Sequence, residues 1–450
     1  MRKPWERPSA LIGFELEQRL AEGCVVEPNL VTQIEAAQTG GNDAQLLTLF
    51  EQLAALTPDA AFPFEEPTDL DAIRASRPHG PRRCALAADI DLFDRIYGAW
   101  LGRAAGCALG KPVEKWPKQI IDEYLRHYDA LPLDNYIPAG KGAPPDHPEH
   151  FYVSGMDCTR GNITLMPRDD DMDFTILGLS ILEDYAGDFT SVDVGSAWLN
   201  RLPYNLVYTA ERVAYRNLIN DLLPPLSAMT NNPFREWIGA QLRADMWGYV
   251  APGWPEKAAA MAFRDASISH TKNGVYGAMF VAALLAASFA TSNIKALIDI
   301  ALSEIPANCR LAQAVRNTMA WAEANDDWQD TWALVNEKFG HYPDVHTINN
   351  AALIVMGLVH GMGDFEQTIV TTVLGGWDAD CTGATAGSVI GLILGAKALP
   401  EKWVGVFNDQ IQSAVRGYED CRLSDLAQRT CRFADAHRPV SYTHLRAHET

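Results

Sequence analysis

Positive charge is scarce in this sequence of 450 residues: 37 Lys and Arg stand against 57 Asp and Glu, which gives a formal net charge of −20. Nucleic acids and anionic membranes attract basic surfaces, so we expect neither as a partner. An anionic small substrate is still compatible with this balance, because a bound divalent cation can reverse the sign of the charge at a site.

Paired cysteine motifs and an apolar leader are also missing. The eight cysteines are scattered without a C-x-x-C spacing, which favours free thiols in a reducing compartment. The first twenty residues are charged and lack the apolar stretch of a signal peptide, so the expected location is the cytoplasm. The longest apolar runs, GVYGAMFVAALLAASFA and AGSVIGLILGAKAL, are rich in Gly, Ala and Ser, which predicts core helices rather than membrane spans.

Strand-like alternation is scarce and helical spacing dominates, so the sequence predicts an all-α fold. Residues 1–90 are interpreted as a helical N-terminal extension that ends in a Pro-containing linker. Residues 91–435 form the predicted main domain, with a long Pro- and Gly-rich loop at 130–167. Residues 439–450, PVSYTHLRAHET, continue no pattern and are interpreted as a non-native tail. Nothing in the sequence indicates an oligomeric state.

An acidic cluster opens one of the predicted helices. The stretch PRDDDMDFTIL, residues 167–177, holds Asp169, Asp170, Asp171 and Asp173. One or two aspartates would suffice to cap the helix, because their carboxylates accept hydrogen bonds at a helix start and favour its dipole. A calcium EF-hand loop is excluded, since Phe174 and Ser180 stand where that loop needs Gly and Glu. The cluster therefore exceeds what capping requires.

The D-D-x-x-D magnesium motif of all-α prenyl-transfer enzymes is a remote alternative. Asp169, Asp170 and Asp173 match it. A second match consists of Asp326, Asp327 and Asp330. Those enzymes bind diphosphates and carry arginines just after the first motif, whereas FTILGLSILEDYAGDF contains neither Arg nor Lys. The second match also lies at an expected helix start, where capping explains it.

A second acidic helix start occurs about two hundred residues later. In GGWDADCTGATAGSVIGLILGA, residues 375–396, Asp378 and Asp380 lie two apart in a Gly-flanked turn. Mg²⁺ prefers carboxylate oxygens as ligands. The two acidic helix starts could therefore converge on a pair of metal ions, Mg²⁺ or Mn²⁺. Upstream, Gly102, Gly106 and Gly110 recur every four residues, which predicts a close helix–helix contact.

Four blocks of sequence resemble the ADP-ribosylglycohydrolase family. They are IYGAWLGRAAGCALGKPVE (96–114), RDDDMDFTILGL (168–179), RDASISHTKNGVYGAMFVAALLA (264–286) and GGWDADCTGATAGSVIGLILGAKALPEKW (375–403). Their order and spacing make the resemblance specific. It implies an all-α orthogonal helical bundle with two Mg²⁺ ions in a central cleft. It also implies hydrolysis of ADP-ribosyl bonds in an ADP-ribosylated protein or a small ADP-ribosyl compound.

The resemblance also implies roles for particular residues. The implied metal ligands are Asp169, Asp170, Asp171, Asp378 and Asp380. Glu114 matches a glutamate that transfers a proton, and Asp171 is the second expected catalytic residue. His270 matches a substrate-cleft histidine, although a capping or core histidine is the alternative. The segment IGAQLR, residues 238–243, stands where the family has N-G-A-x-M-R, which implies substrate contacts from Gly239 and Arg243.

Three departures from the family pattern concern the same cleft. Cys381 stands where the family has a metal-binding threonine, and a thiol is a poor ligand for Mg²⁺, so Asp169 or Thr382 would have to compensate. Cys107 replaces an aspartate, and the Asn of the N-G-A-x-M-R segment is missing. The leading interpretation is a Mg²⁺-dependent hydrolase of ADP-ribosyl or related ribosyl glycosidic bonds. The alternative is a non-catalytic family member that binds ADP-ribose-like ligands or serves structurally.

Overall fold

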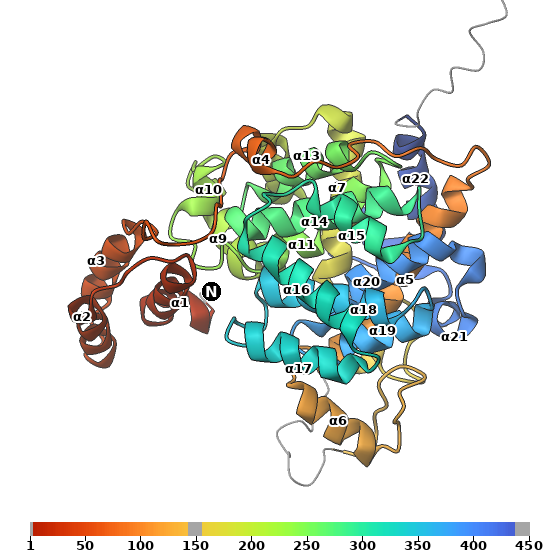
Figure 1. Ribbon diagram of the computed structural model, residues 1–450, viewed down its shortest axis with the longest axis horizontal. Coiled ribbons are helices and arrows are strands. Elements are labelled where there is room, and N and C mark those ends of the chain that lie inside the picture. The colour runs from red at the N-terminus through yellow and green to blue at the C-terminus, as the bar shows by residue number, and fades with distance from the viewer. Residues whose placement is uncertain (1–2, 143–154, 437–450) are drawn as a thin grey trace, which may run out of the picture.

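The computed structural model describes residues 3–142 and 155–436, and Figure 1 shows that this part of the chain is almost entirely helical. Among these residues, the strands β1 (Gln410–Gln412) and β2 (Asp420–Arg422) form one short antiparallel hairpin. The predicted all-α fold is therefore confirmed. The predicted tail and residues 143–154 of the predicted loop lie outside the described residues.

Four helices precede the main body of the molecule: α1 (Pro8–Ala21), α2 (Pro28–Thr39), α3 (Asp43–Ala54) and α4 (Leu70–Ser76). Figure 1 shows α1, α2 and α3 together at one edge of the molecule. Apolar residues at helical spacing, among them Ile12, Ile34 and Leu53, pack into a small core of their own. No helix occurs between α3 and α4, where the linker was predicted.

The main body runs from α5 (Leu92–Gly110) to α22 (Leu423–Ala436). The helices between them are α6 (Lys118–His127), α7 (Asp170–Tyr185), α8 (Ser191–Arg201), α9 (Thr209–Ile219), α10 (Leu226–Met229), α11 (Gly239–Leu242), α12 (Asp245–Tyr249), α13 (Pro255–Ala266), α14 (Lys272–Ser288), α15 (Ile294–Leu302), α16 (Arg310–Ala324), α17 (Trp328–Phe339), α18 (Thr347–His360), α19 (Phe365–Val373), α20 (Ala379–Leu394) and α21 (Glu401–Val404).

Helices α5 and α20 lie against each other in the middle of the main body. All residues of 98–110 in α5 and of 379–392 in α20 are buried. Their backbones meet at three glycine pairs: Gly98 with Gly391, Gly102 with Gly387, and Gly106 with Gly383. Glycine has no Cβ, so the two helix axes can approach closely at these positions. The predicted helix–helix contact is confirmed.

The two apolar runs are buried core helices, as expected. They form α14, which is buried from Asn273 to Ser288, and most of α20. Among the helices of residues 3–142 and 155–436, none combines the length and the apolar character needed to cross a membrane.

Candidate metal centre and pocket

Two acidic helix starts form the centre of the candidate site. Asp169 is the N-cap of α7, and its carboxylate accepts a hydrogen bond of 3.0 Å from the main-chain N–H of Asp171. Asp378 is the N-cap of α20, and the Asp380 carboxylate accepts a hydrogen bond of 3.0 Å from the N–H of Cys381. Free N–H groups and the helix dipole both favour negative charge at these positions. Carboxylate oxygens of Asp171 in α7 and Asp380 in α20 lie within 4.8 Å of one another, so the two helix starts lie close together.

Possible ligand atoms form three contiguous groups, and within each group the atoms lie within 4.8 Å of one another. The groups are Cys107–Asp169–Asp171, Asp171–Asp380–Cys381 and Glu114–Asp378–Asp380. Asp171 and Asp380 each belong to two groups, which links all three. Asp170 is half-buried and lines the pocket beside them. The structure therefore brings together the five aspartates and the glutamate that the sequence singled out.

The protein itself neutralises only part of this charge. Lys111 Nζ lies 3.0 Å from an oxygen of Asp169, and Arg103 Nη2 lies 3.3 Å from an oxygen of Asp171. The ion pairs of the described part of the chain do not reach the other three aspartates. The site therefore holds more negative than positive charge.

Burial and repulsion from neighbouring carboxylates raise the pKa values of Asp171, Asp378 and Asp380. Burial and the charge of Glu114 raise the pKa of Asp378 to about 7. Burial, Glu114 and Asp378 raise the pKa of Asp380 well above its usual range. For Asp171 burial also raises the pKa well above that range, although Arg103 opposes the shift. The ionised form of these carboxyl groups is favourable only when cations balance its charge. Carboxylate oxygens are ligands that Mg²⁺ and Mn²⁺ prefer, so these residues fit a hard divalent cation.

Two thiols border the carboxylates. Cys107 Sγ lies 3.9 Å from Asp171 Oδ2, and Cys381 shares a ligand group with the same aspartate. Burial raises the pKa of both thiols well above the usual range, so they remain protonated and are poor partners for a hard cation. The Thr382 hydroxyl donates to the main-chain carbonyl of Asp378 at 2.9 Å, which leaves its oxygen lone pairs free, so its compensation for Cys381 stays a prediction.

A pocket of about 550 Å³ opens onto the carboxylates, a volume typical of small-molecule sites. Its acidic lining consists of Glu114, Glu211, Asp169, Asp170, Asp378 and Asp380, with Asp344 beside them. Its aromatic lining consists of Trp5, Phe14, Phe174, Tyr208, Phe234 and Trp237. The pocket thus combines a carboxylate-rich surface with an apolar, aromatic one.

Glu114 stands where the chain leaves α5. A single 3-10 turn, η2 (Lys111–Val113), follows the helix, and Glu114 comes directly after it. Its Oε1 lies 3.0 Å from Lys115 Nζ, and its side chain is 30% exposed. It is also in one ligand group with Asp378 and Asp380. This position is suited both to proton transfer in the pocket and to contact with a metal.

Only Gly239 of the three predicted substrate-binding residues lines the pocket. Its helix is packed so tightly on Glu211 that a Cβ at position 239 would clash with that carboxylate. Arg243 is buried beneath the wall and donates to Asp265 at 2.7 Å and to Glu211 at 2.6 Å. His270 is buried there too, with Nδ1 2.8 Å from the Ser269 hydroxyl. Any influence of Arg243 and His270 on a substrate would act through the pocket wall, and their substrate-binding role stays a prediction.

The remaining acidic motifs have structural roles. Asp173 lies 2.7 Å from Arg168 Nε and accepts a hydrogen bond of 2.8 Å from the Ala414 N–H. In the second D-D-x-x-D match, Asp327 caps α17 by accepting a hydrogen bond of 2.9 Å from the Gln329 N–H. Capping therefore explains the second match, as expected from its place at a helix start.

Sequence reasoning missed several lining residues. Lys111 stands three positions before Glu114 in a block already singled out, so its proximity to the acidic cluster was available from the motif. Glu211 and Asp344 belong to no recognised motif. Trp5 and Phe14 come from the N-terminal extension, and no spacing relates them to the acidic motifs.

The fold and the site define an all-α protein with a carboxylate centre where two buried helices begin, at the base of a small-molecule pocket. The sequence model of the family described as ADP-ribosylglycohydrolase matches residues 88–436. The chain belongs to this family, which supports a glycosidase role and confirms the resemblance seen in the four blocks. One similar solved structure is an ADP-ribosylglycohydrolase-related protein complex, with 19% identity, a TM-score of 0.48, and coverage of 76% of this chain and 99% of the other. No curated protein matches the chain.

Proposed function

We propose that this protein is a Mg²⁺-dependent hydrolase of ADP-ribosyl, or related ribosyl, glycosidic bonds. The observation that carries the proposal is the convergence of two acidic helix starts and Glu114 on one pocket. Membership of the ADP-ribosylglycohydrolase family supports the class of bond. The substrate would be an ADP-ribosylated protein or a small ADP-ribosyl compound.

The carboxylates would hold two Mg²⁺ ions, with Mn²⁺ as a substitute. The ligands would be Asp169, Asp170, Asp171, Asp378 and Asp380. Bound ions of this kind hold sugar hydroxyls and polarise a water molecule. Arg103 donates to the main-chain carbonyl of Asp171 at 2.8 Å as well as approaching its carboxylate, and so fixes the orientation of this residue at the centre of the cluster.

Glu114 would transfer the proton in the glycosidic step. Cleavage of such a bond passes through an oxocarbenium-like state, and a carboxyl group at the departing or attacking oxygen lowers its energy by exchanging a proton. The Lys115 ammonium, 3.0 Å away, holds the Glu114 carboxylate at the pocket edge. The side chain retains access to solvent, so it can regain or release its proton after each turnover.

A non-catalytic ADP-ribose binder is the second candidate, and two observations favour it. The protonated thiols of Cys107 and Cys381 replace oxygen groups beside the carboxylates. Ile238, where the family has Asn, lines the pocket and offers no polar side chain to a substrate. Both changes leave a pocket that could bind without turning over.

A substrate screen separates these functions. Purified full-length protein is assayed against ADP-ribosyl-arginine, ADP-ribosyl-serine and nucleosides, with Mg²⁺ or with EDTA. We expect Mg²⁺-dependent turnover of at least one compound. Binding of ADP-ribose without turnover would favour the binder, and absence of both would overturn both functions. An allylic diphosphate serves as the test of prenyl transfer, and we expect no turnover of it.

A further inference from the structure

The N-terminal extension contributes side chains to the pocket that contains the carboxylates. Trp5, in the turn before α1, and Phe14, within α1, line it together with residues of the main body. The family match begins at residue 88, so both aromatic residues lie outside the family domain. The pocket is therefore shaped in part by a segment that the family domain does not contain.

Phe14 is the centre of an aromatic cluster. Its ring centroid lies 5.2 Å from that of Phe234 and 5.5 Å from that of Trp237, and the latter two rings are 4.6 Å apart. All three rings line the pocket. Ile238 adds an apolar surface next to Trp237. Trp5 lines the same pocket, and we call the four aromatic residues Trp5, Phe14, Phe234 and Trp237 the aromatic wall.

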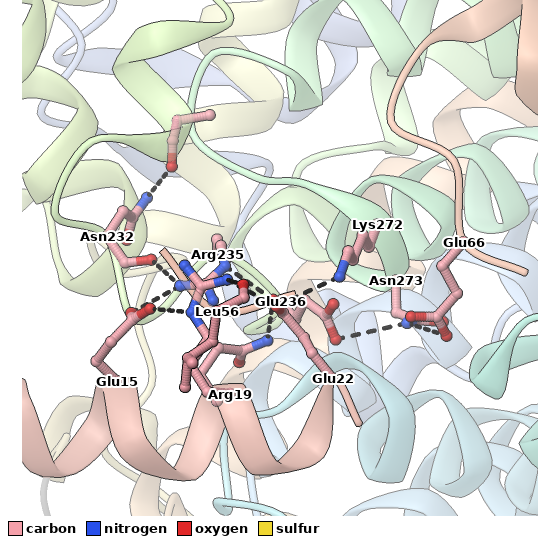
Figure 2. Close-up of polar contacts among 12 residues, drawn as sticks. Glu15, Arg19, Glu22, Leu56, Glu66, Asn232, Arg235, Glu236, Lys272 and Asn273 are labelled. Carbon is pink, nitrogen blue, oxygen red and sulfur yellow. Dashed lines mark hydrogen bonds and ion pairs between the residues drawn. The ribbon is translucent and has the colours of Figure 1, made fainter. Parts of the chain in front are cut away.

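Buried ion pairs fix α1 beside this wall. Figure 2 shows Glu15 of α1 and Glu22, the C-cap residue of that helix, pointing towards Arg235 of the main body. The distances are 2.8 Å from Glu15 Oε2 to Arg235 Nη1 and 2.9 Å from Glu22 Oε1 to Arg235 Nε. Lys272 approaches Glu22 at 3.3 Å. Breaking such buried pairs is costly, so α1 is held in place rather than resting loosely on the surface.

The anchor and the aromatic wall are contiguous in the main body. Arg235 directly follows Phe234 and lies two positions before Trp237, so the segment that binds α1 also carries half of the wall. A second anchor holds Trp5, because the neighbouring Glu6 is buried and lies 3.0 Å from Arg212 Nε. The complete aromatic wall therefore requires the extension to be docked on the main body.

We propose that residues 4–21 are part of the substrate site, and that the aromatic wall packs against a planar ring of the substrate. This inference rests on the proposed function. A ligand that suits the whole pocket needs a flat ring for the wall and, for the carboxylate centre, a hydroxyl-rich end or an anionic end that bound cations would balance. A nucleotide-type compound with a nucleobase has both. Base–aromatic stacking is a common source of affinity for such rings.

Two probes test the proposal: ADP-ribose, and ribose 5-phosphate, which lacks the adenylate part of ADP-ribose and with it the nucleobase. Calorimetry on the full-length protein with Mg²⁺ gives both affinities. We expect Phe14→Ala and Trp5→Ala each to weaken ADP-ribose binding by about 10-fold, the range of one stacking contact, and to leave ribose 5-phosphate binding unchanged. Phe64→Ala is the matched control, because this aromatic residue of the extension lines a neighbouring cavity and not the pocket.

Two further variants test the anchor of α1 and the ring of Phe14 separately. The double variant Glu15→Gln with Glu22→Gln changes no pocket residue but weakens the ion pairs that hold α1, and we expect the same selective loss of ADP-ribose binding. Phe14→Leu preserves apolar volume without the ring and should weaken ADP-ribose binding as well. Unchanged ADP-ribose affinity in these variants, or equal losses for both probes, would overturn the inference. If the unaltered protein binds neither probe, the proposed function itself fails, and this inference fails with it.

Discussion

Gly106 of α5 faces the main-chain carbonyl of Gly383 in α20 so closely that a Cβ on Gly106 would overlap that oxygen. This contact lies near the end of α5 that leads to Glu114 and near the start of α20 that carries Asp380. The spacing between the two backbones therefore sets the distance between Glu114 and the acidic helix start.

Replacing Gly106 by Ala should therefore damage both stability and the site. The added methyl group meets backbone atoms, which cannot move aside as a flexible side chain would, so we expect a loss of about 1–3 kcal/mol or more. Denaturant unfolding and Mg²⁺ calorimetry measure the two effects. Gly13→Ala in α1 is the control, because a Cβ there meets only Gln38 Nε2 at 3.9 Å. Equal stability of both variants would contradict the close packing.

Asp378 should be needed for metal binding but not for the metal-free fold. Asp378→Ala removes one oxygen ligand and one of several repelling charges, so we expect Mg²⁺ affinity to fall at least ~10-fold and turnover to be abolished. The melting temperature should fall only when Mg²⁺ is present. Asp326→Ala, an exposed acid at a helix start, is the control and should change neither quantity. Normal calorimetric binding in Asp378→Ala would remove this residue from the metal site.

Much of this centre could be predicted from sequence because its geometry is local. A carboxylate at a helix start has a defined direction relative to the following helix, so Asp169 and Asp378 could be placed once their helices were recognised. Spacing could not show which side of a short helix faces the pocket. Gly239 and Arg243 belong to one motif, yet only Gly239 lines the pocket.

The contribution of the extension could not be predicted for a different reason. Phe14 and Trp237 lie far apart in the sequence, and no motif connects them, although their rings are in contact. Their contact lies beside the buried pair between Glu15 and Arg235, and both belong to the folded arrangement and not to local spacing. Helical pattern predicted α1 but not the surface on which it docks.

Metal removal should destabilise the protein at neutral pH. Without a cation the clustered carboxylates repel one another, while bound Mg²⁺ stabilises only the folded state. At a Mg²⁺ concentration 100 times Kd we expect about 2.7 kcal/mol of additional stability. Melting curves at pH 7.5 with EDTA and with Mg²⁺ measure the difference. Coincident curves would count against a metal at this site, and Asp378→Ala should show a much smaller difference than the unaltered protein.

The anchor of α1 should lose strength in acid. Burial alone would raise the pKa of Glu22, but Arg235 and Lys272 lower it from 4.5 to about 2. The folded-state pKa lies below the unfolded one, so the stabilisation is complete above about 4.5 and is lost as the pH falls through 2. Glu22→Gln should cost on the order of 3 kcal/mol at pH 7 and progressively less below pH 4.5. Unfolding series from pH 7 to pH 3 test this.

The exposed Glu51 provides the matched control for that series. Glu51→Gln lies in α3 of the same extension, so it should differ little from the unaltered protein at any pH. A Glu22→Gln difference that stays constant between pH 7 and pH 3 would show that the carboxylate does not ionise as the pair with Arg235 requires.

Glu114→Gln distinguishes proton transfer from structure and from metal binding. Glutamine preserves size and most hydrogen bonding but carries no transferable proton, so kcat should fall by about 10²–10⁴-fold. If proton transfer is the sole role of Glu114, Mg²⁺ affinity and melting temperature stay unchanged. Its place in one group with Asp378 and Asp380 also allows metal contact, in which case Mg²⁺ affinity falls together with the rate. The exposed Glu337→Gln serves as the control. Unchanged turnover in Glu114→Gln would exclude Glu114 from the mechanism, because loss of either proton transfer or metal contact would lower the rate.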